Sequence, residues 1–401
     1  MGHSIAARLI ESLPDRFRGP APKEAAGRYR ISIGRTSRDV VVKGGGIRVD
    51  RIQGRADVEI RCDLETWTAI EDGHISGIEA FANGRLNVRG SIDRSLWFET
   101  LFERPAAGAM HYDLERVSLG RTKISTLIAG PPDATPLVLL HGLGATKSSW
   151  LPIVPQLARE HRVYALDLPG FGSSSKPPGR YNAPWFAERV VSFMDKLGIE
   201  NACVAGNSMG GRIAMEVAMT NPERVAAIAC LCPATAFSYR PAAWLARLAR
   251  PELGIAAARL PRQRVVAGLK ELFADPKAVS PDWYDAAVDD FLTIWRSPSA
   301  RIAFFASLRS IYLEEPYGEA GFWGRLSSMR TPALYLYGRK DHLITPRFGP
   351  KVAAALPSAR VIVWDDCGHV PQIEHPDRTV DEMLGFFAFA RGGLKADAAA
   401  I

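Results

Sequence analysis

The sequence predicts an open, mostly parallel α/β sheet with helices on both faces, preceded by a small α+β domain. In the longer, C-terminal part, short continuous apolar runs alternate with helical segments, as expected for strands buried on both faces of a parallel sheet. In the N-terminal part, apolar and polar residues alternate, which is typical of half-buried strands. Residues 104–110, a run rich in small residues with proline and glycine, separate the two patterns and predict a linker.

The composition is that of a globular, soluble protein. Hydrophobic residues make up 47% and charged residues 23% of the 401 residues, which excludes wholesale disorder. No stretch approaches the roughly 18 uninterrupted apolar residues that span a bilayer. The formal net charge is +7, but the chain lacks the block of lysine and arginine that nucleic-acid binding requires, so we expect no nucleic-acid partner.

The cysteines and the first residues predict a cytoplasmic location. Five cysteines are too few for a disulfide scaffold and odd in number, and no cysteine–histidine cluster has zinc spacing. Residues 1–12 lack the apolar core and small-residue cleavage site of a secretory signal. We therefore expect a reducing compartment, no resident metal ion and no cofactor. The sequence leaves the oligomeric state open.

The N-terminal part contains five runs that predict strands and two that predict helices. The strands are expected near residues 29–33, 40–42, 47–49, 56–60 and 86–88, and the helices near residues 64–70 and 95–102. Glycine triplet 44–46 and the Asn83-Gly84 pair lie between strands as turn signals.

One stretch of this part resembles a known family. Residues 54–67 read G-R-A-D-V-E-I-R-C-D-L-E-T-W, and residues 80–90 read A-F-A-N-G-R-L-N-V-R-G. This pattern resembles the sterol-carrier-protein-2-like lipid-transfer domain over residues 25–105. The resemblance implies an apolar tunnel for a fatty acyl chain or a sterol. A domain that serves only for packing or dimerisation is the alternative.

The C-terminal part contains six buried-strand patterns separated by helical segments. The strands are expected at residues 136–140, 162–168, 201–205, 225–231, 333–337 and 361–364. One of the helices opens with Asn182 followed by Pro184, a cap residue and a proline in the first turn.

The motif with the clearest chemistry is G-N-S-M-G at residues 206–210. It lies directly after the apolar strand at 202–205 and before the helical run at 212–219, the strand–turn–helix context that G-x-S-x-G requires. The glycines allow a tight turn, so the Ser208 hydroxyl projects beyond the strand end, where free N–H groups of the helix N-terminus point. Ser208 is therefore the predicted nucleophile.

A serine nucleophile needs a base and an acid that orients the base. In this architecture the order along the chain is Ser, Asp, His, each after a strand. Asp341 follows the strand at 333–337, and His369 follows the strand at 361–364. His342 and His375 are the competing histidines, and their positions favour surface roles.

The oxyanion hole needs two backbone donors. The N–H of Met209, directly after the nucleophile, is the first candidate. The N–H of Leu143, in the H-G-L-G loop at residues 141–144, is the second. His141 in the same loop is interpreted as a packed, hydrogen-bonded structural histidine.

With these residues in place, residues 112–392 resemble an α/β-hydrolase-fold serine hydrolase. Supporting marks are D-L-P-G-F-G at residues 167–172 and Gly368-His369. Ser208 excludes the relatives with an aspartate nucleophile, the haloalkane dehalogenases and epoxide hydrolases. The form G-N-S-M-G-G resembles carbon–carbon bond hydrolases that act on ring-fission products, whereas L-C-P-A at residues 231–234 resembles monoacylglycerol-lipase-like esterases. Val370 stands where the carbon–carbon branch carries an aromatic residue, which favours an ester substrate.

A long insertion at about residues 236–330 is predicted to form a lid, and it is rich in aromatic residues. Its basic part, residues 240–264, alternates arginines with apolar residues. Such a segment fits peripheral contact with an anionic membrane or with a substrate carboxylate, and equally a solvated helix face.

These observations predict a serine hydrolase that cleaves a carboxylic ester of a lipid-like or other hydrophobic substrate through an acyl-enzyme intermediate. Two alternatives stay open. One is a carbon–carbon bond hydrolase acting on a ring-fission diketone. The other is a lipid-transfer protein in which the hydrolase-like part is not catalytic.

Overall fold

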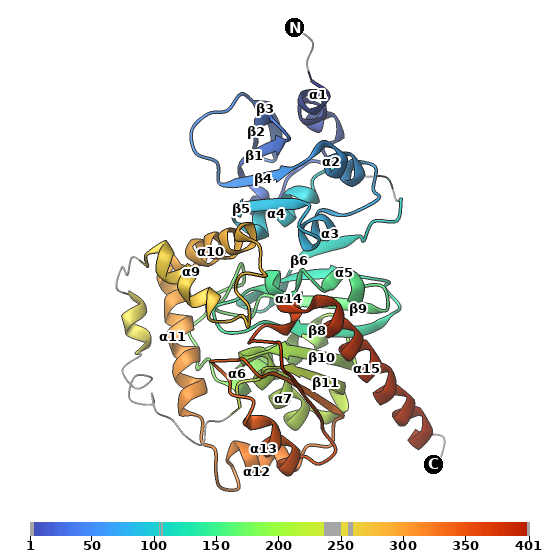
Figure 1. Ribbon diagram of the computed structural model, residues 1–401, viewed down its shortest axis with the longest axis vertical. Helices are drawn as coiled ribbons and strands as arrows, with labels where there is room; N and C mark the ends of the chain where they lie inside the picture. The colour runs from blue at the N-terminus through green and yellow to red at the C-terminus, as the bar shows by residue number, and fades with distance from the viewer. Residues whose placement is uncertain (1–3, 104, 106, 236–249, 256–259, 399–401) are drawn as a thin grey trace. The chain divides into compact units, whose positions relative to one another are not determined.

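The computed structural model describes residues 4–103, 105, 107–235, 250–255 and 260–398. The chain divides into two compact units (Figure 1). The N-terminal unit comprises Met1–Leu114 together with Val279–Thr293, and the C-terminal unit comprises Glu115–Ala278 and Ile294–Ile401. The predicted bounds of the domains, 25–105 and 112–392, stay predictions.

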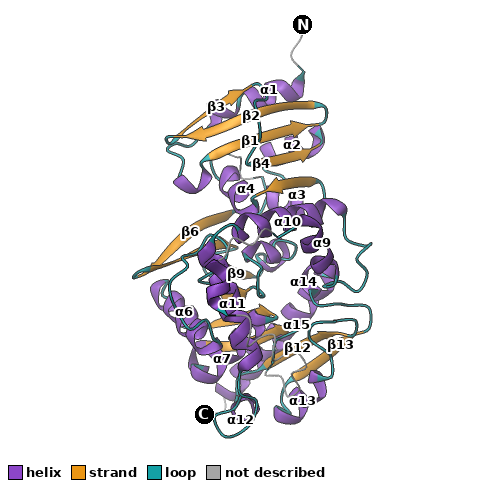
Figure 2. Ribbon diagram, turned by 90° about the vertical axis from the view of Figure 1, so that its left-hand side faces the viewer, coloured by secondary structure: helices purple, strands orange, loops and turns teal. Residues whose placement is uncertain are grey.

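The N-terminal unit is built on a five-stranded sheet in the order β3-β2-β1-β4-β5. The strands are β1 (Gly27–Ile33), β2 (Thr36–Lys43), β3 (Gly46–Asp50), β4 (Val58–Cys62) and β5 (Leu86–Gly90). The helices are α1 (Ile5–Glu11), α2 (Leu64–Glu71), α3 (Gly77–Ala82) and α4 (Ile92–Glu99), with short 3₁₀ turns at Leu13–Arg16 and Lys23–Ala25. Figure 2 shows β3, β2, β1 and β4 side by side, with β1 and β4 parallel and the other pairs antiparallel. All five predicted strands and both predicted helices are present.

The core of this unit forms where the sheet meets α4. Tyr29 and Ile31 alternate toward the core and are fully buried, as their period-two spacing predicts. The ring of Tyr29 stacks on that of Phe98 with a centroid distance of 4.4 Å. The Tyr29 hydroxyl donates to the carbonyl of Ala25 at 2.6 Å, so its polar end is satisfied inside the core.

The C-terminal unit is built on an eight-stranded sheet in the order β13-β12-β11-β10-β8-β9-β7-β6. The strands are β6 (Tyr112–Leu119), β7 (Thr122–Ala129), β8 (Thr135–Leu140), β9 (His161–Leu166), β10 (Ala202–Asn207), β11 (Val225–Leu231), β12 (Ala333–Gly338) and β13 (Arg360–Trp364). The neighbouring pairs from β13 to β9 are parallel, and β7 is antiparallel to β9. The six strands that the sequence predicts form the parallel part, and the sequence analysis missed β6 and β7.

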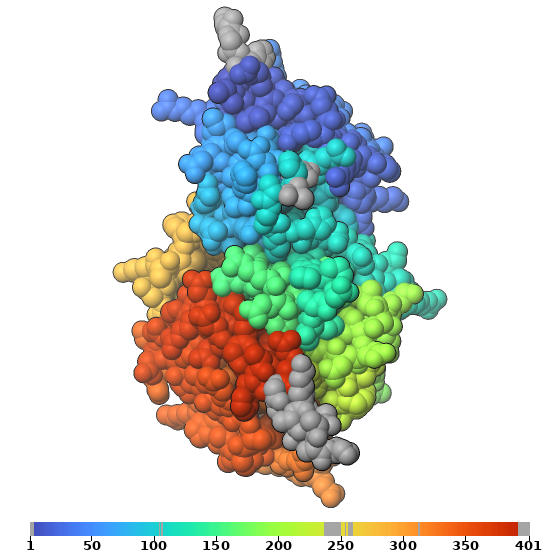
Figure 3. Space-filling model, turned by 90° about the vertical axis from the view of Figure 1, so that its right-hand side faces the viewer, coloured from blue at the N-terminus to red at the C-terminus, as the bar shows by residue number. Residues whose placement is uncertain are grey.

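Helices flank this sheet and occupy the insertion after β11 (Figure 1). Those that flank the sheet are α5 (Val154–Leu157), α6 (Ala183–Lys196), α7 (Met209–Thr220), α13 (Phe348–Ala355), α14 (Pro371–Glu374) and α15 (Pro376–Ala398). Those of the insertion are α9 (Arg262–Lys270), α10 (Pro281–Trp295), α11 (Pro298–Leu313) and α12 (Phe322–Ser327). Short 3₁₀ turns occur at Lys147–Trp150, Pro222–Arg224 and Pro251–Ile255. Figure 3 shows the last part of the chain, in red, on the surface of the C-terminal unit.

The insertion is only partly described. Arg240, Trp244 and Arg247 of the predicted basic, apolar segment lie outside the described residues, as does Arg259. Arg262 begins α9. Among the helices of the described residues, none has both the length and the apolar character needed to cross a membrane.

Candidate active site

The nucleophile elbow joins β10 to α7. Ser208 has φ 55° and ψ −114°, a left-handed conformation that is strained for a residue with a side chain. Two hydrogen bonds to neighbouring segments hold it: the Ser208 N–H donates to the Leu231 carbonyl at 2.9 Å, and the Ala234 N–H donates to the Ser208 carbonyl at 3.0 Å. The Ser208 side chain therefore stands at the N-terminus of α7.

Glycines are required around Ser208 because the backbone passes very close to other backbone. A Cβ atom at Gly210 would lie 2.0 Å from the carbonyl oxygen of Leu140, and one at Gly206 would lie 2.2 Å from the carbonyl carbon of Gly210. Such contacts are far inside van der Waals distance, and neither neighbour is a side chain that can rotate away. The spacing of G-x-S-x-G is thus a steric requirement of this turn.

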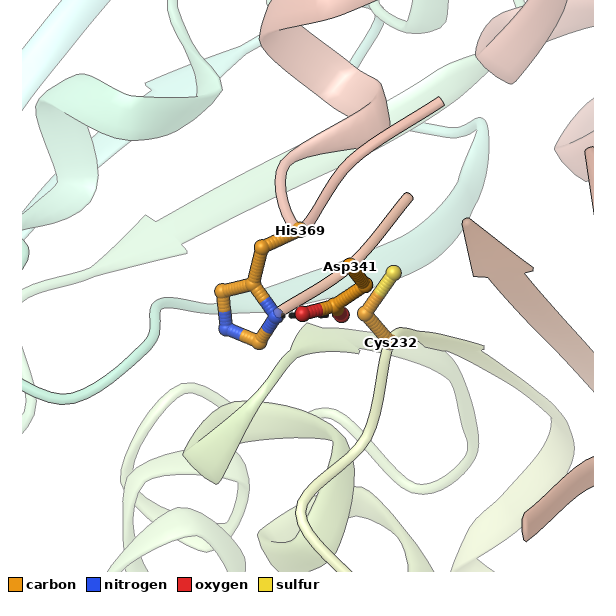
Figure 4. A group of neighbouring side chains, drawn as sticks. All are labelled: Cys232, Asp341 and His369. Atoms are coloured by element: carbon orange, nitrogen blue, oxygen red, sulfur yellow. Dashed lines mark hydrogen bonds and ion pairs between the residues drawn. The ribbon is translucent and has the colours of Figure 1, made fainter. Parts of the chain in front are cut away.

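The predicted base and acid meet at the ends of β12 and β13. His369 Nδ1 and Asp341 Oδ2 are 2.7 Å apart, and both residues are buried (Figure 4). The other oxygen of Asp341 accepts N–H bonds from Leu343 and Ile344, each at 2.8 Å. A carboxylate fixed in this way accepts a hydrogen bond from the Nδ1–H of His369, and this tautomer leaves the lone pair on Nε2.

The elbow and the histidine loop are tied together by Asn207, the residue before the nucleophile. Its Nδ2 donates to the His369 carbonyl at 3.0 Å and to the Leu231 carbonyl at 3.1 Å. Within the described residues, no hydrogen bond joins the Ser208 hydroxyl to His369. Catalytic hydrogen bonds are often long before substrate binds, so the pairing of Ser208 with His369 stays a prediction.

The segments that carry the two candidate oxyanion donors border Ser208. Met209 is the first residue of α7, where backbone N–H groups have no acceptor within the helix. The loop that carries Leu143 approaches from β8. A Cβ atom at Gly142 would lie 3.4 Å from Ser208 Cβ and 3.2 Å from Asn207 Oδ1. The two segments that the sequence predicts as donors are therefore neighbours in the fold.

His141 has a structural role, in agreement with its interpretation from sequence. Its Nε2 lies 3.0 Å from the N–H of Leu168 and must accept, so Nδ1 carries the proton and donates to the Gly142 carbonyl at 2.7 Å. Burial lowers the pKa of His141, which keeps the ring neutral. Since both ring nitrogens are occupied, His141 is unsuited to be the base.

A buried ion pair supports the same loop. Lys147 Nζ is 2.9 Å from Asp167 Oδ2, the Lys147 N–H donates to Asp167 Oδ1 at 2.8 Å, and the Ser173 N–H donates to Oδ2 at 2.8 Å. Burial alone would raise the pKa of Asp167, but the Lys147 ammonium holds it below its usual range. The pair fixes the segment after the oxyanion loop against the loop that follows β9.

Three potential metal ligands also cluster at this site, as Figure 4 shows. The ligand atoms of Cys232, Asp341 and His369 all lie within 4.8 Å of one another. Burial raises the pKa of the Cys232 thiol well above its usual value, so it stays protonated, and it donates to the Gly368 carbonyl at 3.4 Å. The oxygens of Asp341 already accept three N–H groups. The hydrogen bonds of an Asp–His pair account for this cluster.

The competing candidates lie apart from this pair. His342 is exposed, and His375 Nε2 contacts the Asp366 backbone carbonyl at 3.1 Å. Asp365 is at the surface, ion-paired with Arg339.

Sequence reasoning missed two residues that hold the site together. The sequence analysis uses Asn207 only as part of the G-N-S-M-G-G form of the elbow and gives it no role in holding the site. Glu374 binds the N–H of Gly368 at 2.7 Å and that of Ala274 at 2.6 Å, and so fixes the loop that carries His369. No local pattern distinguishes Glu374, because its partners lie in a separate loop and a separate turn.

A cavity of about 560 Å³ opens beside Met209 within the C-terminal unit. Helices α6, α7, α11 and α12 contribute to its wall. Phe186, Ile213 and Phe322 give it apolar area, and the buried Arg212, which is ion-paired with the partly exposed Glu314, gives it polar area. Such a mixed lining suits a substrate that has both an apolar part and a polar group.

Comparisons with known proteins identify the class of both units. The chain belongs to the alpha/beta hydrolase fold family, whose model matches residues 135–376. The model of the SCP-2 sterol transfer family matches residues 8–103, so both resemblances found in the sequence are confirmed. The chain is thus a hydrolase of the α/β fold with an N-terminal sterol-carrier domain.

Curated relatives include several enzyme activities. The chain is 32% identical over 273 residues to a dihydrolipoyllysine-residue acetyltransferase component of an acetoin cleaving system from Pseudomonas putida, covering 68% of each chain. It is 29% identical over 261 residues to a pimeloyl-[acyl-carrier protein] methyl ester esterase from Aeromonas hydrophila, covering 61% of this chain and 92% of that protein. It is 29% identical over 277 residues to a 2-hydroxymuconate semialdehyde hydrolase from a Pseudomonas species, covering 66% of this chain and 89% of that protein.

A solved structure with the same fold is that of a membrane phospholipase A described as a bacterial virulence factor. It aligns with a TM-score of 0.59 and 28% identity, over 70% of this chain and 87% of the other. The relatives thus include an esterase, a carbon–carbon bond hydrolase and a phospholipase.

Proposed function

We propose that the protein is a serine hydrolase that cleaves a carboxylic ester of a lipid-like or other hydrophobic substrate through an acyl-enzyme. Ser208 is the nucleophile, His369 the general base and acid, and Asp341 the carboxylate that orients the imidazole. The observation that carries the proposal is the 2.7 Å hydrogen bond between His369 and Asp341, in a loop that Asn207 of the elbow binds directly.

In this mechanism His369 Nε2 takes the proton of Ser208 as Oγ attacks the ester carbonyl carbon. The N–H groups of Leu143 and Met209 donate to the negative oxygen of the tetrahedral intermediate, where fixed donors stabilise developing charge most. His369 then protonates the departing alcohol. Water, deprotonated by the same imidazole, hydrolyses the acyl-enzyme and releases Ser208.

Four features favour an ester with a lipid-like part. The sterol-carrier family suggests hydrophobic, lipid-like ligands for the N-terminal unit. The cavity beside Met209 combines apolar and charged walls. Val370, rather than an aromatic residue, follows His369, and an esterase and a phospholipase are among the relatives.

Replacement of the nucleophile tests the proposal. Ser208→Ala should lower kcat for p-nitrophenyl esters by about 10⁴- to 10⁶-fold, leaving the contribution of the oxyanion hole. Ser192→Ala, which removes a surface hydroxyl of α6, is the matched control and should leave kcat unchanged. A Ser208→Ala enzyme that keeps more than a tenth of wild-type activity would rule out the assignment.

The second candidate is hydrolysis of a carbon–carbon bond in a ring-fission diketone, which the G-N-S-M-G-G elbow and the semialdehyde hydrolase relative favour. A chromogenic ring-fission substrate turned over faster than p-nitrophenyl esters would decide for it. The third is lipid transfer without catalysis. Failure of a fluorophosphonate to label Ser208 in the folded protein would decide for that function.

A further inference from the structure

Helix α10 lies in the predicted lid by sequence but folds with the sterol-carrier domain. Residues Val279–Thr293 belong to the N-terminal unit, although the chain on either side of them belongs to the C-terminal unit. Nearly all of α10 is included, because the helix runs from Pro281 to Trp295.

An acidic face of α10 binds the end of β5 and the start of α4. Arg89 Nη1 lies 2.7 Å from Asp285 Oδ2, and Arg89 Nε lies 3.0 Å from Asp289 Oδ2. Asp289 also accepts the N–H of Gly90 at 3.1 Å, and Asp290 accepts the N–H of Ile92 at 3.3 Å. Ile92 is the first residue of α4, where both the unpaired N–H groups and the helix dipole favour a carboxylate.

Buried side chains as well as the partly exposed ion pairs hold α10 in place. Asp290 is 7% exposed, and Tyr284, Ala286 and Val288 of the same helix are buried. The one arginine reaches two carboxylates one turn apart, so its loss removes both ion pairs at once. Asp285 is about one-third and Asp289 one-fifth exposed, so both carboxylates keep contact with solvent when Arg89 is replaced.

The far end of α10 is fixed to the helix that lines the cavity. Arg301 of α11 is buried and donates from Nη1 to the carbonyls of Trp295 at 2.7 Å and Arg296 at 3.1 Å. The Trp295 ring also packs edge-on against Phe304 at a centroid distance of 5.5 Å. Only residues 296 and 297 separate α10 from α11 along the chain.

Helix α11 in turn forms part of the wall of the cavity beside Met209. Ala306, Arg309, Ser310, Ile311 and Leu313 of α11 border this cavity. Arg89 therefore binds a helix that is followed, two residues later in the chain, by a helix of the wall next to a candidate oxyanion donor.

We propose that the sterol-carrier domain sets the chain-length selectivity of the hydrolase by anchoring α10, with Arg89 as the positioning residue. This inference rests on the proposed function, since it concerns which substrates reach Ser208. Release of α10 shifts α11 and changes the space available to a long acyl chain. A short acyl chain, which needs little of that space, is unaffected.

The test compares Arg89→Ala with Arg85→Ala in the full-length protein. Arg85 directly precedes β5 and binds Glu65 and Thr66, within the same unit, so it is a matched loss of an arginine. Arg89→Ala should raise amide hydrogen exchange in residues 279–295 by about tenfold, and Arg85→Ala should not. The ratio of kcat/KM for p-nitrophenyl palmitate to that for p-nitrophenyl butyrate should change by about fivefold in Arg89→Ala, through KM for the palmitate.

A second variant approaches the contact from α10. Asp285→Asn combined with Asp289→Asn should reproduce both effects, which covers the case in which Arg89→Ala fails to fold. Faster exchange of α10 with an unchanged palmitate-to-butyrate ratio would overturn the proposal. So would unchanged exchange in both variants.

A labelling assay separates this proposal from the proposed function. If the wild-type protein hydrolyses neither ester, the ester hydrolase assignment fails, and the rates at which ethyl and dodecyl fluorophosphonates label Ser208 then report selectivity. A change in the dodecyl-to-ethyl ratio in Arg89→Ala supports the anchoring role. An unchanged ratio, or no labelling by either reagent, overturns it.

Discussion

The elbow at Ser208 and the anchor at Arg89 both join segments that are far apart in sequence, but they do so by different physical means. At the elbow, backbone meets backbone: Gly206 and Gly210 leave no room for a Cβ atom, and the strained Ser208 is held by hydrogen bonds to Leu231 and Ala234. At the anchor, the partly exposed side chains of Arg89, Asp285 and Asp289 form ion pairs, beside the buried Asp290.

The difference has a consequence for how each region tolerates change. A Cβ atom added at Gly206 or Gly210 would lie about 2 Å from backbone atoms that cannot rotate away, so substitution there is expected to abolish the geometry of the elbow. Ion pairs between partly exposed side chains contribute at most about 1 kcal/mol each to stability. Their two partners can be replaced by other charged residues or swapped in sign. The proposed nucleophile therefore lies on the rigid elbow, whereas the proposed control of selectivity lies on the anchor, which tolerates more change.

The largest expected effect is the loss of catalytic rate when the acid beside the elbow is replaced. Asp341→Asn should lower kcat by about 10⁴-fold, because an amide no longer fixes the His369 tautomer that leaves Nε2 free to accept a proton. The measurement is kcat for p-nitrophenyl butyrate with urea unfolding as a control for folding. Asp365→Asn, which alters a surface carboxylate paired with Arg339, should stay within twofold of wild type. A loss below tenfold for Asp341→Asn would contradict the assignment of the acid.

The second effect tests the steric argument directly. Gly210→Ala brings a methyl group to 2.0 Å from the Leu140 carbonyl oxygen, so the elbow and β8 must separate. We expect destabilisation of about 3 kcal/mol, the upper end for overpacking, with loss of activity. Gly385→Ala in α15, where a methyl group meets nothing within 4 Å, is the control and should not be destabilising. An active, stable Gly210→Ala protein would show that the elbow can shift to accommodate a Cβ atom and would contradict the steric argument.

Low pH should destabilise the C-terminal unit by protonating His161, the first residue of β9. Burial lowers the pKa of His161 from 6.5 to about 4, so the folded state binds this proton less readily than the unfolded chain. The contribution of neutral His161 to the free energy of unfolding is therefore present well above pH 6.5 and is lost as the pH falls toward 4, by about 1.3 kcal/mol between pH 7.5 and 5.5. Calorimetric unfolding of the wild-type and His161→Gln proteins at pH 7.5 and 5.5 measures this change in stability. An equal acid effect in both proteins would exclude His161 as its source.

The sequence predicts the elbow far better than the anchor. The six parallel strands and the elbow were predictable because each depends on residues close together in the chain: apolar runs and the glycines around Ser208. The proximity of Asp341 and His369 was predictable because the strand order brings successive strand ends to one edge of the sheet. The 2.7 Å hydrogen bond between them agrees with that reasoning.

The features that the sequence does not reveal depend on contacts with partners far along the chain. Arg89 and Asp285 are separated by 196 positions, and nothing near either residue marks the other as its partner. Helix α10 was assigned to the lid on sequence continuity alone. Strands β6 and β7 were missed at the sheet edge, where β6 alternates buried and exposed residues and lacks the continuous apolar run of its neighbours.

The smallest expected effect separates charge from hydrogen bonding at the anchor. Asp290→Asn keeps an oxygen that can accept the Ile92 N–H but removes the negative charge at the N-terminus of α4. The helix dipole favours such a charge by about 0.3–1 kcal/mol, so amide exchange in residues 86–99 should rise by less than tenfold. Asp50→Asn, at a surface carboxylate of the same unit paired with Arg48, should not change it. If Asp290→Asn instead releases α10 as fully as Arg89→Ala, the buried carboxylate rather than the arginine holds the helix. The anchor would then share the rigid character of the elbow.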